Sequence, residues 1–263
     1  MLRKLWKQEA KASGRTIVGM YGVLAAATIF LILLFLASKL VGEGVMNVIF
    51  AIGCSIYALT VITVAVTNFI FLCVRFYQTM YSHQGYLTHT LPVKSTQILH
   101  IKLAVSFVYF FLTVFFLIAS FLIIGINMDG KSFVVVWELF CSWVAEISEQ
   151  LNIPGSVFVL FGFALMVLGC LDALLLFFAG SSIGQLFHRS KGACGIAAGI
   201  VLYYGTQFVS LFLVLLGAGL FEMLSVGNLA LWAMGGVCLL MTVWAVVYYM
   251  INRVVVQRHL NLE

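Results

Sequence analysis

The stretch Leu103–Asn127, LAVSFVYFFLTVFFLIASFLIIGIN, contains no charged residue over its whole length. A helix of about 20 consecutive apolar residues crosses a hydrocarbon layer about 30 Å thick, so this stretch is long enough to span a membrane. It is too long and too unbroken for a barrel strand, which needs about ten residues of alternating polarity. Because a helix satisfies its own backbone hydrogen bonds in lipid, the stretch predicts a transmembrane α-helix.

Five further stretches of the same kind lie on either side of it. The six predicted spans cover residues 16–40, 45–74, 103–127, 155–187, 193–216 and 229–251. Of the 263 residues, 63% are hydrophobic and 9% are charged, and the mean hydropathy is +1.14. A soluble domain of this size could not keep so much apolar surface away from water. We therefore predict an all-α polytopic membrane protein with six transmembrane helices, forming a single domain over residues 1–263.

The basic residues are unevenly distributed among the segments that join the predicted spans. Only Lys39 and Lys131 lie on one side of the membrane. The side that holds both termini carries Arg3, Lys4, Lys7, Lys11, Arg15, Arg75, Lys94, Lys102, Arg189, Lys191, Arg253 and Arg258. The positive-inside rule then places both termini in the cytoplasm. The net charge of +5 follows from this topology and does not indicate a nucleic-acid partner.

An amphipathic segment precedes the first span. Leu2, Leu5 and Trp6 share one helical face, and three lysines share the opposite face. This pattern suits a helix on the inner membrane surface, with its lysines toward anionic lipid headgroups. We expect an amphipathic N-terminal helix that contacts membrane lipids.

A second amphipathic segment, Ser132–Leu151, follows the third span. Apolar residues recur along it at three- and four-residue spacing, and Glu138, Glu146 and Glu149 occupy the other face. We predict one external amphipathic helix within residues 128–154, lying against the outer leaflet or capping the bundle. Both amphipathic segments are equally compatible with simple interfacial anchors.

Two short motifs match catalytic patterns without the context that those patterns need. Gly125–Ser132, GINMDGKS, matches the phosphate-binding loop GxxxxGK[ST], but it follows a membrane span on the predicted outer side instead of joining a strand to a helix. Gly180–Gly184, GSSIG, matches GxSxG, but all five histidines fall in predicted cytoplasmic segments. We expect no catalytic residue, no metal site and no cofactor on this chain, and we interpret GSSIG as small residues that let helices approach closely.

One acidic residue lies inside a predicted span. Asp172 is near the middle of the fourth span, in the run GCLDALLL. A carboxylate at that depth costs several kcal/mol unless it faces the bundle interior, is protonated or finds a partner. Asp172 is therefore a candidate for the translocation path or for a proton site, and the alternative is a hydrogen bond to a neighbouring helix or a dimer interface.

The polar segment Arg75–Lys102 interrupts the apolar sequence between the second and third spans. Within it, residues 85–93 read GYLTHTLPV, and Lys102 opens the next span. This stretch resembles bacterial ABC exporter permeases of the ABC-2 type, which carry a related sequence between their second and third spans. Residues 182–192, SIGQLFHRSKG, provide a second resemblance. Residues 82–84, SHQ, stand where acidic residues are common in that family.

The resemblance implies a fold like that of the G-subfamily (type V) exporters and a non-enzymatic transport subunit. It implies that residues 75–102 form a coupling segment on an ATP-binding cassette subunit, which would carry ATP and Mg²⁺. A second permease chain, in a homodimer or a heterodimer, would complete the path for hydrophobic or amphipathic cargo such as an antimicrobial peptide, a lipid or a drug-like molecule. The coupling residues would be Tyr86, Leu87, Thr88, His89, Leu91 and Pro92.

The composition of the polar segment is compatible with that role. Aromatic and apolar residues alternate with polar ones, as in a short helix that docks in a groove of a partner protein. The alternative is a helix that lies in the headgroup region. Two other classes stay open: a membrane-embedded enzyme that uses Asp172 or Ser182, and a secondary carrier coupled through Asp172. We expect the chain in a bacterial plasma membrane, with multiple passes.

Overall fold

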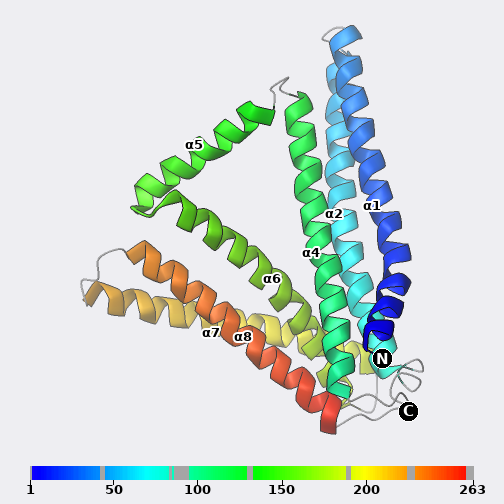
Figure 1. Ribbon diagram of the computed structural model, residues 1–263, viewed down its shortest axis with the longest axis vertical. Coiled ribbons are helices and arrows are strands. Elements are labelled where there is room, and N and C mark those ends of the chain that lie inside the picture. Colours follow the sequence, from blue (N-terminus) through cyan, green and yellow to red (C-terminus); the bar gives the residue numbers. More distant parts are fainter. Residues whose placement is uncertain are drawn as a thin grey trace. The chain divides into compact units, whose positions relative to one another are not determined.

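The computed structural model describes residues 2–41, 45–82, 85, 95–128, 133–187, 191–223 and 229–258. These ranges contain long α-helices and no strand (Figure 1). The helices are α1 (Leu2–Val41), α2 (Val45–Tyr81), α4 (Ser95–Met128), α5 (Phe133–Leu151), α6 (Gly155–Gly184), α7 (Lys191–Met223) and α8 (Leu229–Arg258). The prediction of an all-α fold is confirmed.

Six of these helices are long and apolar enough to cross a membrane, and α5 is not among them. Most of the helices are longer than the predicted spans. Hydropathy shows only where the apolar residues end, whereas a helix can continue through the polar residues that follow. As a result, α2 runs to Tyr81 and α4 begins at Ser95, so both ends of the polar segment are helical. The helix α6 ends at Gly184, before residue 187 at which the predicted fourth span ends, and the N–H of Gln185 turns back to the Ser182 carbonyl.

The amphipathic N-terminal segment is the first part of α1. No non-helical residue separates it from the first span, and the 40 residues of α1 form a helix about 60 Å long. A hydrocarbon layer about 30 Å thick covers only half of that length. The basic first turns of α1 therefore extend beyond the lipid interior.

The chain forms two compact units. Unit 1 contains Met1–Leu72 and Val108–Ser142, and unit 2 contains Cys73–Phe107 and Trp143–Glu263. Three helices, α2, α4 and α5, contribute residues to both units. In the described residues the division therefore runs through helices, and a single membrane domain remains our prediction.

Polar contacts connect the helices of unit 1. The Tyr57 hydroxyl of α2 lies 2.7 Å from Ser120 Oγ of α4, and Asn68 Nδ2 of α2 donates to Thr113 Oγ1 of α4 at 2.7 Å. Tyr21 of α1 also approaches Thr113, at 3.0 Å. Hydrophobic burial cannot drive helix association in lipid, so such bonds and close packing hold membrane helices together.

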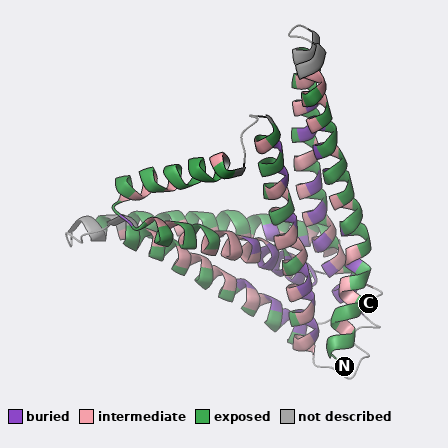
Figure 2. Ribbon diagram, turned by 45° about the horizontal axis from the view of Figure 1, so that its top comes forward, coloured by how far each residue is buried: buried purple, intermediate pink, exposed green. Residues whose placement is uncertain are grey.

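The core of unit 2 lies along the C-terminal half of α6. The buried residues of α6 lie in that half, and α6 packs against both α7 and α8 (Figure 2). Leu175 and Ala179 form an apolar cluster with Tyr248 of α8. Gly180 and Gly184 of α6 face Gly195 and Gly199 of α7, so the two backbones come into direct contact.

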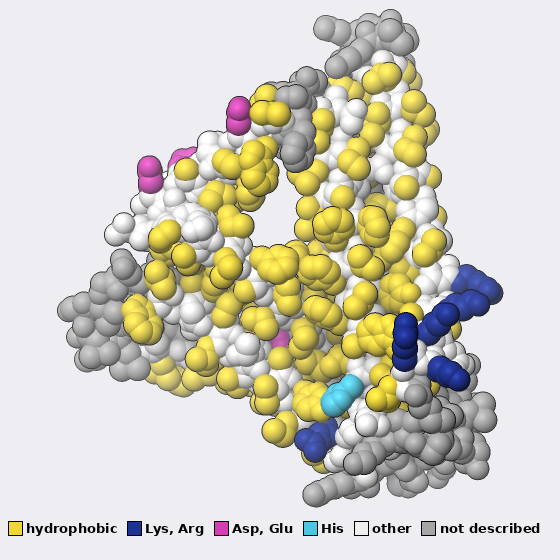
Figure 3. Space-filling model, viewed as in Figure 1, with side chains coloured by type: hydrophobic (Ala, Val, Ile, Leu, Met, Phe, Trp, Pro, Cys, Tyr) yellow, Lys and Arg dark blue, Asp and Glu magenta, His cyan; other side chains and the backbone are white. Residues whose placement is uncertain are grey.

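The predicted helix between the third and fourth spans is present as α5. It ends at Leu151, where Asn152 adopts a positive φ of 54° and Ile153 N–H bonds back to the Ser148 carbonyl. A left-handed residue of this kind commonly terminates a helix. The acidic side chains of α5 are exposed on its surface (Figure 3), and its external location remains a prediction.

Candidate functional site

The structure describes the two edges of the predicted coupling segment. The coupling residues themselves, Tyr86, Leu87, Thr88, His89, Leu91 and Pro92, lie outside the described residues. The C-terminal end of α2 and the N-terminal end of α4 border them on either side. Both edges belong to unit 2. The end of α2 contacts α6 and the start of α4 contacts α8, and these contacts make up the candidate site.

The end of α2 is buried. Phe76, Met80 and Tyr81 have almost no exposed surface, although they follow the predicted end of the second span. The ring of Phe76 stacks on that of Phe178 in α6, with centroids 3.7 Å apart and planes 7° from parallel. The last turns of α2 are therefore packed on the core of unit 2.

A buried hydrogen-bond network joins α2, α6 and α8. Ser182 Oγ donates to Asn252 Oδ1 at 2.7 Å. Because a serine hydroxyl has one proton, the Tyr81 hydroxyl must donate the bond that it makes to Ser182, also at 2.7 Å. Asn252 Nδ2 then donates to the backbone carbonyls of Tyr248 at 2.9 Å and Leu175 at 3.2 Å. We call this the Tyr81–Ser182–Asn252 network.

The start of α4 is tied to α8. Ile98, Leu99 and Lys102 are buried. His100 Nε2 lies 2.6 Å from the Tyr249 hydroxyl of α8, and the two rings stack with centroids 5.6 Å apart. Each edge of the predicted coupling segment thus has a direct contact with α6 or α8. A displacement of either helix end would therefore be transmitted to α6 or α8.

The network also gives Ser182 a structural function. Its described partners are a tyrosine hydroxyl and an asparagine amide, and neither is a general base of the kind that activates a serine nucleophile. A Cβ built on Gly184 would lie 2.5 Å from Gly195 Cα. The contacts of GSSIG therefore support our interpretation of that motif as a close helix crossing.

Asp172 is half-buried on α6. Its Oδ1 is buried and has no hydrogen-bond partner in the part of the chain that the structure describes. Tyr248 of α8 is close enough to interact with it electrostatically. The structure thus places an incompletely satisfied carboxylate in the membrane-spanning part of α6, between the middle of the helix and the network.

In the part of the chain that the structure describes, the other motifs show no assembled reactive site. Of the phosphate-loop match, Gly125 is an exposed residue of α4, and Asp129–Ser132 lie outside the described residues. Among the described residues no group of His, Cys, Asp or Glu could hold a metal ion, and the cysteines are free.

Sequence reasoning missed two buried amides that join helices. Asn68 lies within the predicted second span and donates to Thr113, whereas Asn252 directly follows the predicted sixth span and belongs to the network. For Asn68 the available signal was a polar amide inside an apolar run, because such a group needs an internal partner in lipid. The identity of that partner depends on which helices meet.

Comparisons with known proteins identify no relative. No family profile, no curated protein and no solved structure matches this chain.

Proposed function

We propose that this chain is the membrane-spanning permease subunit of an ATP-driven ABC exporter in a bacterial plasma membrane. Its six helices of spanning length fit a membrane transport protein. ATP and Mg²⁺ would bind to a separate ATP-binding cassette subunit, and a second permease chain would complete the translocation path. The proposed cargo is hydrophobic or amphipathic, because the spans offer few charges to an ion or a sugar.

One observation carries this proposal. The segment whose sequence resembles a coupling element is bounded by helix ends that are buried against α6 and α8. Tyr81 hydrogen-bonds to Ser182, Phe76 stacks on Phe178 and His100 contacts Tyr249. A partner that moved residues 85–93 would displace the ends of α2 and α4, and these contacts would pass the displacement to α6 and α8.

The experiment purifies the full chain from its native membranes together with whatever chain it binds. We expect a second chain that is labelled by a photoreactive ATP analogue and hydrolyses ATP. Replacing both Tyr86 and Leu87 by Ala should lower the retained ATP-binding chain by about thirtyfold, because truncating interface anchors costs about 2 kcal/mol or more.

The matched control is Tyr204→Ala with Leu215→Ala. These residues lie on α7 and are 68% and 63% exposed, so this variant removes the same two side-chain types from an exposed helix surface outside residues 75–102. It should retain the ATP-binding chain. Equal retention by both variants, or a wild-type chain that purifies without an ATP-binding protein, would contradict the proposal.

A secondary carrier is the second candidate, and Asp172 is the observation that favours it. Within a span, a carboxylate oxygen that has no hydrogen-bond partner among the described residues is a typical feature of proton-coupled transport. If the purified protein, reconstituted in liposomes, transports cargo under a pH gradient without ATP, that result would support the carrier and exclude the exporter.

A further inference from the structure

The first turns of α1 are strongly basic. Arg3, Lys4, Lys7, Lys11 and Arg15 are all exposed, and Glu9 is the only acidic residue in α1. Figure 3 shows Lys and Arg side chains gathered in the region of the α1 N-terminus. This part of the helix presents a concentrated positive surface.

The position of these charges is unfavourable for the helix itself. The N-terminus of an α-helix carries a partial positive charge, and cations in the first turn weaken an exposed helix by about 0.3–1 kcal/mol each. The first turn of α1 contains Arg3 and Lys4 and no acidic residue. Helix stability therefore does not account for this charge pattern, and a bound anion would relieve the repulsion.

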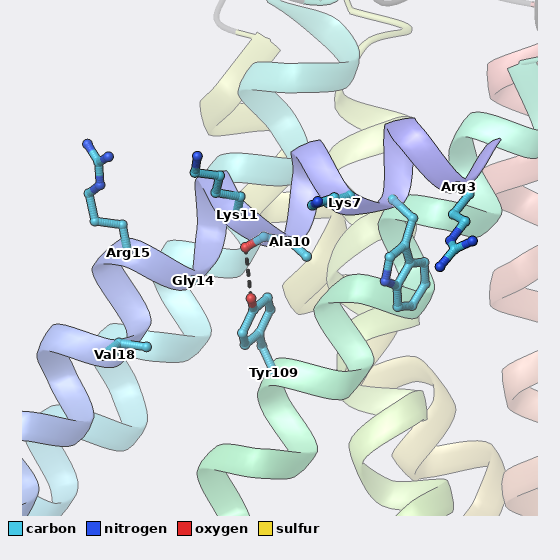
Figure 4. Close-up of a pocket in the computed structure, with 9 residues that line it drawn as sticks. Arg3, Lys7, Ala10, Lys11, Gly14, Arg15, Val18 and Tyr109 are labelled. Carbon is cyan, nitrogen blue, oxygen red and sulfur yellow. Dashed lines mark hydrogen bonds between the residues drawn. The ribbon is translucent and has the colours of Figure 1, made fainter. Parts of the chain in front are cut away.

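A hollow of about 780 Å³ lies beside this basic segment, between α1 and α4 of unit 1 (Figure 4). Tyr109 of α4 reaches α1 and donates to the Ala10 carbonyl at 2.8 Å. Gly14 makes room for this approach, since a Cβ there would lie 2.7 Å from the Tyr109 hydroxyl. The hollow is lined by Arg3, Trp6, Lys7, Ala10, Lys11, Gly14, Arg15, Val18 and Tyr109.

The cations border this hollow along the helix. Figure 4 shows Tyr109 meeting α1 at Ala10 from one side, whereas Lys11 and Arg15 extend from the other side. Arg3, Lys7, Lys11 and Arg15 follow one another at four-residue spacing, which turns slowly around the helix because 3.6 residues make one turn. The positive charges therefore follow one another along α1, and the apolar and aromatic lining residues lie beside them.

The order of residues along α1 matches the polarity of a membrane boundary. Residues 16–38 contain no charge and span about 34 Å as a helix, which is close to the hydrocarbon thickness. Arg15 therefore lies at the edge of the hydrocarbon, and Lys11 and Lys7 lie one and two turns farther out. Val18, which also lines the hollow and is 64% exposed, lies on the lipid side of Arg15.

We propose that this hollow binds the headgroup of an anionic phospholipid. Its phosphate would sit among Lys7, Lys11 and Arg15, and the start of an acyl chain would lie along Val18. The basic residues complement the charge of the headgroup, and the apolar lining begins at the membrane boundary, where the acyl chains begin. This combination favours a lipid over a soluble anion. Lysines and arginines near a membrane surface each contribute measurably to the binding of anionic lipids. This inference does not depend on the proposed transport function.

The test measures lipid retained by the full-length protein in detergent, by native mass spectrometry, as phosphatidylglycerol is titrated against phosphatidylcholine with the same acyl chains. Wild-type protein should retain phosphatidylglycerol preferentially. Lys7→Gln with Lys11→Gln should weaken its apparent affinity about tenfold or more, because two of the cations that line the hollow are lost. Raising the salt concentration should weaken binding as well, since these charges are exposed to screening.

The charge-matched control is Lys4→Gln with Arg253→Gln. Both residues are exposed and neither lines the hollow, so this variant should bind phosphatidylglycerol within about twofold of wild type. Equal losses in the two variants would mean diffuse surface attraction, and displacement of the lipid by millimolar inorganic phosphate would mean a site for a soluble anion. Either result overturns the proposal, as does the absence of a preference for phosphatidylglycerol. If Lys7→Gln with Lys11→Gln does not elute as folded protein, the single variants Lys7→Gln and Lys4→Gln are compared instead, and only Lys7→Gln should weaken phosphatidylglycerol binding.

Discussion

Ser182 illustrates how one small hydroxyl can link three helices. It accepts a bond from Tyr81 and donates one to Asn252, and both Ser182 and Asn252 are fully buried. The same residue is the central serine of GSSIG, which by sequence alone matched a nucleophile pattern. Among the described residues its partners are a tyrosine hydroxyl and an asparagine amide, and neither is a general base of the kind that activates a serine nucleophile.

At this residue scale we predict that Ser182→Ala lowers the free energy of unfolding by about 1 kcal/mol, because the Tyr81 hydroxyl and Asn252 Oδ1 lose their shared partner. Denaturant titration of the purified protein measures the change. Ser55→Ala is the control, since Ser55 is exposed on α2 and its described hydrogen bond goes to the Ala51 carbonyl of its own helix. A loss in Ser55→Ala as large as that in Ser182→Ala would show that the network contributes nothing specific.

Asp172 supports a second prediction at this scale. Asp172→Asn keeps the side-chain shape, removes a charge and breaks no described hydrogen bond at Oδ1. We expect unchanged or higher stability, because a charged carboxylate within the membrane is costly. Transport, or assembly with a partner chain, should change. Reconstituted transport and the elution volume of the complex measure these effects, and if neither differs from wild type, Asp172 serves packing alone.

At the scale of elements, the crossing of α6 and α7 depends on direct backbone contact. A Cβ at Gly184 would lie 2.5 Å from Gly195 Cα and 2.6 Å from the Lys191 carbonyl oxygen. Backbone atoms cannot move aside as a side chain can, so any larger residue must push the helices apart. Small residues at such positions are the usual means of close approach between membrane helices.

We therefore predict that Gly184→Ala destabilises the protein by about 1–3 kcal/mol, the usual cost of overpacking. Gly205→Ala is the matched control, because Gly205 is also helical, lies on α7 and has nothing within 4 Å of the added Cβ. Alanine is the better helix former, so Gly205→Ala should leave stability unchanged or raise it. Thermal unfolding of both variants decides the matter, and a stable Gly184→Ala protein would refute the close crossing.

At the scale of the whole molecule, the orientation in the membrane rests on the distribution of basic residues. The positive-inside rule predicts that α5 lies outside and that the start of α1 lies inside. Cys141 is an exposed native cysteine of α5, so an impermeant maleimide should label it in intact cells and should not label Cys141→Ser. Lys11→Cys in the Cys141→Ser background should react only after the cells are permeabilised. The reverse pattern of labelling would invert the topology.

Most of the fold was predictable from the sequence because the bilayer imposes a simple rule. A run such as Leu103–Asn127 must be helical in lipid whatever surrounds it, and all six predicted spans are present as helices. The ends of the spans were less predictable, since nothing in the hydropathy of Val74–Tyr81 shows that the helix continues there. The end of α6 at Gly184 likewise depends on a local turn.

The sequence by itself determined the class of the molecule and the number of its spans. It also singled out two candidate functional features, Asp172 and the polar segment Arg75–Lys102. Only the tertiary structure decided which polar groups meet. Tyr81, Ser182 and Asn252 come from three helices separated by 101 and 70 positions along the chain, and no periodicity links positions so far apart. Hydropathy acts on each helix alone, whereas a hydrogen bond requires two helices at a particular rotation and depth. That is why the network, the α6–α7 crossing and the hollow beside α1 appear only when the helices are assembled.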